Sequence, residues 1–313
     1  MRWLFRKLLW LVGALVLLIL CLLAPVGYVE LACRPDIRAD DYRPILAEAD
    51  RRPEARTLLT YPEWHIVHAY DDYARVITDG DPHDYGYFAS IGGFWSSLCA
   101  LSGETGDHGG FPWETKQMVY TIGVSFTAEM LLKAAYEETL GRAATWIRGD
   151  TRAPLDDLSA LQAASYARFL QQTPWYKWDF AQSGQELRET GGRGFRDRER
   201  RLALGAEYRA KAAYAGVIAQ AVAQVGADAP TLRMIVGGIG ADQLSALPGI
   251  RVIGQRPEGI EVETPRYREL THLLARMATE GASFVEIAGN DDILVTATSA
   301  QPDATGAIFS FPR

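Results

Sequence analysis

The apolar positions near the N-terminus form one uninterrupted run. No charged residue occurs from Leu8 to Val29, and Leu, Val and Ala dominate this segment. As a helix the run would be about 33 Å long, at about 1.5 Å per residue, which is enough to cross the hydrocarbon core of a bilayer. The pattern therefore predicts a transmembrane helix, with residues 1–33 as a membrane anchor and Leu8–Val29 as its contact with the membrane.

The charges on either side of the run predict its orientation. An acid-rich stretch follows it, and the basic residues that precede it are Arg2, Arg6 and Lys7. By the positive-inside rule the N-terminus lies in the cytoplasm and the body lies outside. A signal peptide cleaved near Ala32 is the alternative, although its apolar region is usually shorter, about 7–15 residues. We predict a single-pass protein of the bacterial inner membrane with its body in the periplasm.

Helical periodicity dominates the middle of the chain. Residues 34–56 are rich in Arg, Asp and Pro, which predicts a juxtamembrane linker with a short helix at Ile45–Asp50. Over residues 57–226 apolar positions recur at three- and four-residue steps, which predicts a mainly helical exported domain. Its first expected helix begins at Thr60. The later ones are expected at Tyr85–Leu101, Glu114–Arg142, Leu158–Gln172 and Leu202–Val225.

Short apolar runs bounded by turn residues replace this periodicity after residue 226. They predict strands at Thr231–Val236, Ile250–Ile253, Gly259–Glu263, Ser283–Ala288 and Ile293–Thr298. Between the third and fourth, Thr264-Pro265 marks the start of a helix. Residues 227–313 are therefore expected to form an α+β subdomain. The predicted class is α+β, with one N-terminal transmembrane helix, a mainly helical body, and a C-terminal, mostly antiparallel sheet with one helix.

Composition excludes some classes of function. The 313 residues are 48% hydrophobic and 23% charged, as in globular proteins, and the net charge of −7 argues against nucleic acid as the principal partner. Cys33 and Cys99 lie outside the apolar run and can pair in an oxidising compartment, but the sequence leaves that pairing open.

The densest chemistry lies at the start of the first body helix. Thr60 suits the N-cap, and Glu63 can complete a capping box with it. At about 100° per residue, one face of this helix then carries Tyr61, His65, His68 and Asp72. Two imidazoles, a phenol and a carboxylate on one stripe predict a polar site without specifying a reaction.

Imidazole and carboxylate together form the ligand set of zinc and other first-row divalent metals. The candidate metal ligands are His65, His68, Asp72, His83 and His108. The spacing is not the His-Glu-x-x-His pattern of zinc proteases. The competing interpretation is a polar core in which these histidines hydrogen-bond to tyrosines and carboxylates.

Aromatic residues suggest a second kind of site. A ligand pocket is predicted from Tyr61, Glu63, Trp64 and Trp95. For the aromatic and glycine-rich Tyr85–Leu101 segment, the simpler interpretation is a buried helix that packs closely at its glycines. A second aromatic run, Thr173–Phe180, can either rest among lipid headgroups or cap the core.

Two classes of function follow from these patterns. In the first, the protein is a membrane-anchored cell-envelope protein whose exported body binds a small ligand, a lipid or an envelope protein. The alternative is a metal-dependent envelope enzyme with a site around His65 and His68. The first is preferred because no complete catalytic constellation is visible, and there is no Gly-x-Ser-x-Gly elbow.

Overall fold

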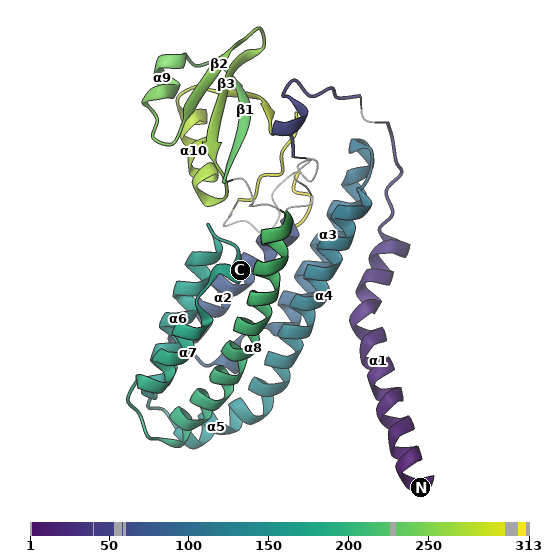
Figure 1. Ribbon diagram of the computed structural model, residues 1–313, viewed down its shortest axis with the longest axis vertical. Coiled ribbons are helices and arrows are strands. Elements are labelled where there is room, and N and C mark those ends of the chain that lie inside the picture. Colours follow the sequence, from purple (N-terminus) through teal and green to yellow (C-terminus); the bar gives the residue numbers. More distant parts are fainter. Residues whose placement is uncertain are drawn as a thin grey trace.

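The computed structural model describes residues 2–39, 41–52, 58, 61–225, 230–297 and 306–310. In this part of the chain a long N-terminal helix lies beside a helical bundle, and a small sheet domain lies at one end of that bundle (Figure 1). The predicted α+β class, with a mainly helical body and a C-terminal antiparallel sheet, is confirmed.

The helices and strands are close to those expected from periodicity. The helices are α1 (Arg2–Ala32), α2 (Tyr61–Asp79), α3 (Tyr87–Glu104), α4 (Trp113–Tyr136), α5 (Arg142–Arg148), α6 (Pro154–Leu170), α7 (Phe180–Glu189), α8 (Phe195–Val225), α9 (Ala241–Ala246) and α10 (Arg268–Thr279). The strands are β1 (Thr231–Gly237), β2 (Arg251–Arg256), β3 (Gly259–Pro265) and β4 (Ser283–Ile287). Short 3₁₀ turns are η1 (Glu48–Asp50), η4 (Pro82–Asp84), η5 (Thr105–His108) and η7 (Trp175–Lys177).

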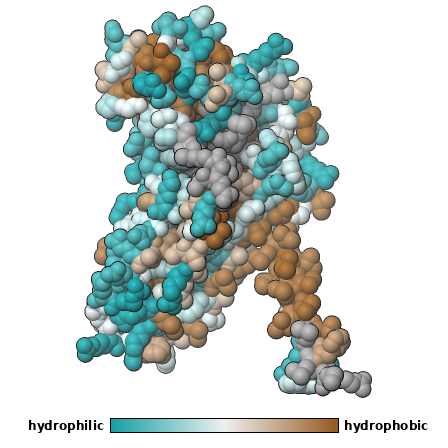
Figure 2. Space-filling model, viewed as in Figure 1, coloured by the Kyte–Doolittle hydropathy of each residue, from teal (hydrophilic) through white to brown (hydrophobic). Residues whose placement is uncertain are grey.

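Helix α1 contains the predicted membrane run. Its segment Phe5–Ala32 is long and apolar enough to cross a membrane, and its side chains are exposed along most of its length. Figure 2 shows it as an apolar column beside a body whose surface is largely hydrophilic. Only its last turns touch the body, where Val29 is buried against the ends of α3 and α4. An N-terminal apolar helix is therefore present, as expected for an anchor or a signal segment.

Glycines allow the body helices to pack closely, as predicted for Tyr85–Leu101. A Cβ atom at Gly93 would lie 2.8 Å from the imidazole of His65, and one at Gly123 would lie 2.4 Å from the ring of Phe94. Gly92 is different, because a Cβ there would meet nothing within 4 Å. The core of the bundle is thus built from rings that fit against bare backbone on neighbouring helices.

The predicted helix Glu114–Arg142 is interrupted near its end. A π-helical turn, Glu137–Gly141, separates α4 from α5. A Cβ atom on Gly141 would lie 2.2 Å from the carboxylate of Glu137, so glycine makes room for this buried acid. The irregular turn therefore places a charged group in the core.

The C-terminal strands form one antiparallel sheet in the order β2-β3-β1-β4. With α9 between β1 and β2 and α10 between β3 and β4, this is the ferredoxin-like arrangement of a split βαβ unit. The sequence predicted one helix here, and α9 is a second, short one. The core of this sheet domain contains Met234, Val262 and Met277, all fully buried.

The prediction of a fifth strand at Ile293–Thr298 is wrong for the residues of it that the structure describes. Residues 293–297 form no strand, and Thr298 lies outside the described residues. The chain instead turns back at Asn290, which pairs with Ile287. The linker occupies the neighbouring position, because Arg52 N donates to Ala288 O at 2.8 Å.

The predicted linker packs against this sheet domain. The buried carboxylate of Glu286 accepts hydrogen bonds from the backbone N–H groups of Ile45 and Leu46. On the same domain, Arg233 forms an ion pair with Asp50 at 3.1 Å. Residues 42–52 therefore pack against the sheet domain and connect α1 to it.

Candidate functional site

The body contains a small cavity between α2, α4, α6 and α8, lined by aromatic, apolar and charged side chains. Its volume is about 40 Å³, and its lining includes Tyr70, Lys133, Glu207 and Lys211. A site for one water needs about 10–15 Å³, and pockets for drug-sized ligands need about 300–1,000 Å³. The cavity therefore has room for a few waters or a small ion, and not for an organic substrate.

Two lysines and two glutamates form a charge-balanced cluster around this cavity. Lys211 Nζ lies 2.8 Å from Glu129 Oε1 and 3.0 Å from Glu207 Oε1. Lys133 Nζ lies 2.9 Å from the same Glu207 oxygen. The four side chains are between 15% and 28% exposed, so each charge has a close partner of opposite sign in a mostly dry environment.

These contacts hold the cluster in its charged form. Burial alone would raise the pKa of Glu207, but the ammonium groups of Lys133 and Lys211 outweigh it and lower that pKa to about 2. Burial opposes the charge of Lys211, yet the neighbouring Glu129 and Glu207 carboxylates raise its pKa well above the usual value. Both lysines thus keep their protons, so neither supplies the free amine that a nucleophilic lysine needs.

Aromatic side chains complete the wall of the cavity. The hydroxyl of Tyr70 donates to Glu129 Oε1 at 2.5 Å, and Lys211 Nζ lies 5.2 Å from the centre of the Tyr70 ring. Lys211 lies at similar distances, 5.5 and 5.7 Å, from the rings of Tyr166 and Phe180. Burial raises the pKa of Tyr70 and Tyr166, which keeps these phenols neutral.

A second buried network lies at the α5 end of the bundle. Arg196 Nε lies 2.7 Å from Asp156 Oδ1, and Arg200 Nη1 lies 2.8 Å from Glu137 Oε1. Arg196 and Arg200 are 2% and 1% exposed. Arg148 bridges Asp156 and Asp81, at 2.9 and 2.8 Å. These contacts join the π-helical turn Glu137–Gly141 and helices α5, α6 and α8, and each named charge has a partner of opposite sign.

A shallow, open groove lies outside this cavity, between the Thr173–Phe180 segment and α8. Its volume is about 380 Å³. Tyr176, Trp178 and Phe180 form an aromatic wall, and the floor consists of small residues of α8, namely Ala212, Ala215, Gly216 and Ala219. The charged side chains of Lys177 and Asp179 also line the groove.

Groove and cavity share part of their walls. Trp178 and Phe180 line both spaces. On α8, Lys211 lines the cavity and the next residue, Ala212, lines the groove. The buried ring of Phe180 therefore stands between the groove and the charged cluster. The segment Thr173–Phe180 also closes the core here, since Trp178 packs edge-on against Tyr166 and Phe169.

His65, the first predicted metal ligand, is buried in the bundle. Its Nε2 lies 2.9 Å from the backbone oxygen of Ser90, and a carbonyl can only accept, so this nitrogen carries the proton. Edge-on contacts with Phe94 and Phe126 surround the ring. His65 thus packs in an aromatic part of the core, with a backbone carbonyl as the acceptor for its Nε2 proton.

Of the other predicted ligands, His68 and Asp72 share α2 with His65, whereas His83 and His108 lie on other elements. His68 stacks near Trp64 on α2, Asp72 pairs with Arg75, His83 lies in η4, and His108 lies in η5. Among the described residues, the one group of three metal-binding side chains with donor atoms within 4.8 Å of one another is Asp81, His83 and Asp84. It includes neither His65 nor His68, so a zinc site at those two histidines stays a prediction.

The predicted ligand-pocket residues fall into two places. Tyr61 and Trp64 belong to an apolar cluster with Leu101 and Phe309, and the Tyr61 and Phe309 rings lie 4.6 Å apart. Trp95 is buried in the bundle core, where its indole N–H donates to Thr127 Oγ1 at 2.9 Å. Glu63 is exposed on the first turn of α2. Thr60, the predicted cap, lies outside the described residues, and α2 begins directly after it.

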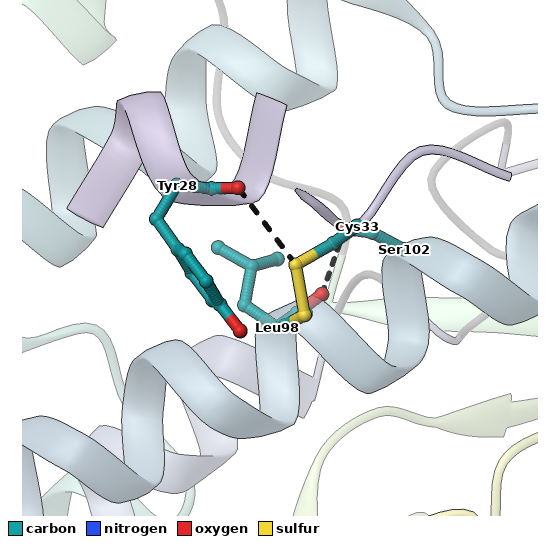
Figure 3. The surroundings of a disulfide bond; sticks show 5 residues. Tyr28, Cys33, Leu98 and Ser102 are labelled. Atoms are coloured by element: carbon teal, nitrogen blue, oxygen red, sulfur yellow. Dashed lines mark hydrogen bonds between the residues drawn. A yellow bond between two sulfur atoms is a disulfide. The ribbon is translucent and has the colours of Figure 1, made fainter. Parts of the chain in front are cut away.

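Helix α1 is attached to the body at two points. Cys33 at the end of α1 forms a disulfide with Cys99 of α3, and Figure 3 shows it between Tyr28 of α1 and Leu98 and Ser102 of α3. One turn earlier, Glu30 Oε1 accepts hydrogen bonds from Lys116 Nζ at 2.8 Å and from the Tyr120 hydroxyl at 2.7 Å. The last turn of α1 is therefore part of the folded body.

Sequence reasoning missed the charged cluster, although two signals for it exist. Glu129 and Lys133 are the only charges in an otherwise apolar stretch of α4, and Glu207 and Lys211 have the same four-residue spacing on alanine-rich α8. Paired charges at this spacing on two apolar helices predict a buried ionic cluster between them. Comparison of the chain with protein-family models, curated proteins and solved structures finds no match.

Proposed function

We propose that the chain is a membrane-anchored protein of the bacterial inner membrane whose periplasmic body binds a ligand with a flat apolar group. The observation that carries the proposal is the groove of about 380 Å³ between Tyr176, Trp178 and Phe180 and the small residues of α8. Its size falls within the range of small-molecule sites, and aromatic walls favour rings and acyl chains.

The two attachments of α1 support an uncleaved anchor. Cleavage near Ala32 would remove Glu30 and leave Lys116 and Tyr120 without that carboxylate. The disulfide between Cys33 and Cys99 supports a body on the oxidising side of the membrane. Together they favour an exported body held close to the end of its own transmembrane helix.

The charged cluster supports binding better than catalysis. Its lysines keep their protons, and its cavity of about 40 Å³ is too small for a substrate. We assign it the role of holding α4 and α8 in one register behind Phe180, so that the groove keeps its shape. A metal-dependent enzyme at His65 and His68 remains the alternative, although the hydrogen bond of His65 to Ser90 O uses one of its two possible ligand nitrogens.

Two matched alanines of α8 test the groove. Ala219 lines the groove and Ala213 does not, and both are exposed. Saturation-transfer NMR on the full chain in nanodiscs should detect binding of indole or hexanoate, which are water-soluble probes for a ring and a short acyl chain. Ala219→Trp should abolish that signal and Ala213→Trp should keep it. If neither probe gave a signal with the unaltered chain, the proposal would be contradicted. A signal that persists in Ala219→Trp would also contradict it.

A further inference from the structure

The outward side of α4 carries no charge over a long distance. From Gln117 to Tyr136 its only charged residues are Glu129 and Lys133, and both are paired with groups inside the bundle. The outward side instead exposes Thr121, Ser125 and Leu132, the last of these 74% exposed. This stretch is about 30 Å long at about 1.5 Å per residue.

The neighbouring helix α3 continues the same surface. The sequence from Tyr85 to Gly103 contains no charged residue. Its exposed side offers Phe88, which is 68% exposed, and a row of small residues that includes Gly92 and Ser96. We call the exposed surface of α3 and α4 between Phe88 and Leu132 the uncharged face.

The uncharged face lies on the side of the bundle next to α1. Helix α1 lies beside α3 and α4 in Figure 1, and the contact is fixed by the Cys33–Cys99 disulfide and by Glu30 with Lys116. The apolar surface of α1 thus continues onto the body at this contact. The opposite side differs, since α7 exposes Gln185, Arg188 and Glu189.

We propose that the uncharged face contacts the lipid bilayer, so that the body rests on the membrane. Two observations point to lipid as the occupant. The two charges of α4 point inward, as in lipid-exposed helices, and the face adjoins the transmembrane helix. The charges on α7 keep the body from crossing the membrane.

Helix α1 contains a residue that allows this arrangement. Pro25 lies inside α1, between the exposed apolar run and the fastened end at Glu30 and Cys33. Proline removes a helical hydrogen bond and is where helices bend. The face can therefore turn onto the bilayer surface while the rest of α1 crosses it. The inference depends on the anchor and its attachments and not on ligand binding in the groove.

Site-specific fluorescence on the full chain tests the proposal. Cys21, a free and exposed cysteine, is first replaced by serine, and the Cys33–Cys99 pair stays oxidised. A nitrobenzoxadiazole label is then placed on Ser125→Cys in the uncharged face, or on Gln185→Cys of α7 as the matched control. In phosphatidylethanolamine/phosphatidylglycerol nanodiscs, the label at position 125 should emit at shorter wavelength than the label at 185. Spin-labelled acyl chains should quench it selectively.

Each outcome decides the proposal. Equal emission and equal quenching at the two positions would overturn it. A blue-shifted label at 125 that lipid spin labels do not quench, together with cross-linking between chains, would show a second copy on this face and would also overturn it. A label on Leu132→Cys gives the same readout if Ser125→Cys fails to fold. Failure here leaves the groove experiment untouched, so the two results are separable.

Discussion

Cys33, directly after the end of α1, is joined to Cys99 in the C-terminal half of α3, and their Cα atoms lie 5.2 Å apart. The bond closes a loop across a sequence separation of 66 residues. In the chain-entropy treatment, closing a loop of this size costs the unfolded state about 4 kcal/mol in free energy, so the bond stabilises the body as well as holding it to α1.

The disulfide should therefore contribute strongly to stability. We expect Cys99→Ser to lower the free energy of unfolding of the body by up to about 4 kcal/mol. Cys21→Ser changes a free, exposed cysteine and should have little effect. Denaturant unfolding of both variants, with and without reductant, measures this. An unaltered chain that is indifferent to reductant would contradict the expectation.

Glu207 should be far more important for stability than an exposed acid. Glu207→Gln leaves Lys133 without its carboxylate and Lys211 with only Glu129, and breaking a buried pair in this way costs about 3–5 kcal/mol. Glu138→Gln removes an exposed partner of Arg142 and should cost less than about 1 kcal/mol. Thermal or denaturant unfolding at neutral pH compares the two, and similar losses would show that the cluster is not structurally dominant.

Because of the low pKa of Glu207, we expect the stability of the body to fall at acidic pH. Glu207 has a pKa of about 2 in the folded state, against a usual value of 4.5. Because the folded-state value is the lower one, its contribution is present above pH 4.5 and is lost as the pH falls from 4.5 towards 2. Unfolding free energy measured across this range should fall, and the fall should be shallower in Glu207→Gln. An identical slope in both proteins would rule out Glu207 as the cause.

Replacement of His65 and His68 separates the two interpretations of their helix. His65 hydrogen-bonds to Ser90 and packs among aromatic rings, so we expect His65→Gln with His68→Gln to lower stability by about 1–3 kcal/mol without changing metal content. Elemental analysis by mass spectrometry, alongside unfolding, measures both effects. One zinc per chain in the unaltered protein, lost in the double variant, would establish the metal-dependent alternative.

Local sequence patterns predicted most of the fold. The apolar run, the helical periodicity and the strand–turn signals are properties of neighbouring residues, and α1, α2 and the first four strands follow from them. The strand at Ile293–Thr298 was predicted from the same local signals. It failed because the place beside Ala288 is taken by Arg52, more than 200 residues away in sequence.

The candidate site depended on contacts that no local pattern contains. Lys211 meets Glu129 from a different helix, and the groove exists only because Trp178 and Phe180 fold against Ala212 and Ala215. The stretch from Tyr61 to Asp72 looked richest in chemistry because its polar groups are close in sequence. In the fold His65 contacts the backbone oxygen of Ser90 and Asp72 contacts Arg75, and neither contact could be predicted from closeness in sequence to the other candidate ligands.

The central claim is an exported body that stays joined to a membrane anchor, and side-specific labelling tests it most directly. In spheroplasts carrying the full chain with Cys21→Ser, a membrane-impermeant maleimide should label Gln185→Cys on α7 as fully before lysis as after it. The labelled chain should remain in the membrane fraction with its N-terminus intact. Labelling only after lysis, or a labelled chain that is soluble and lacks residues before Cys33, would contradict the account.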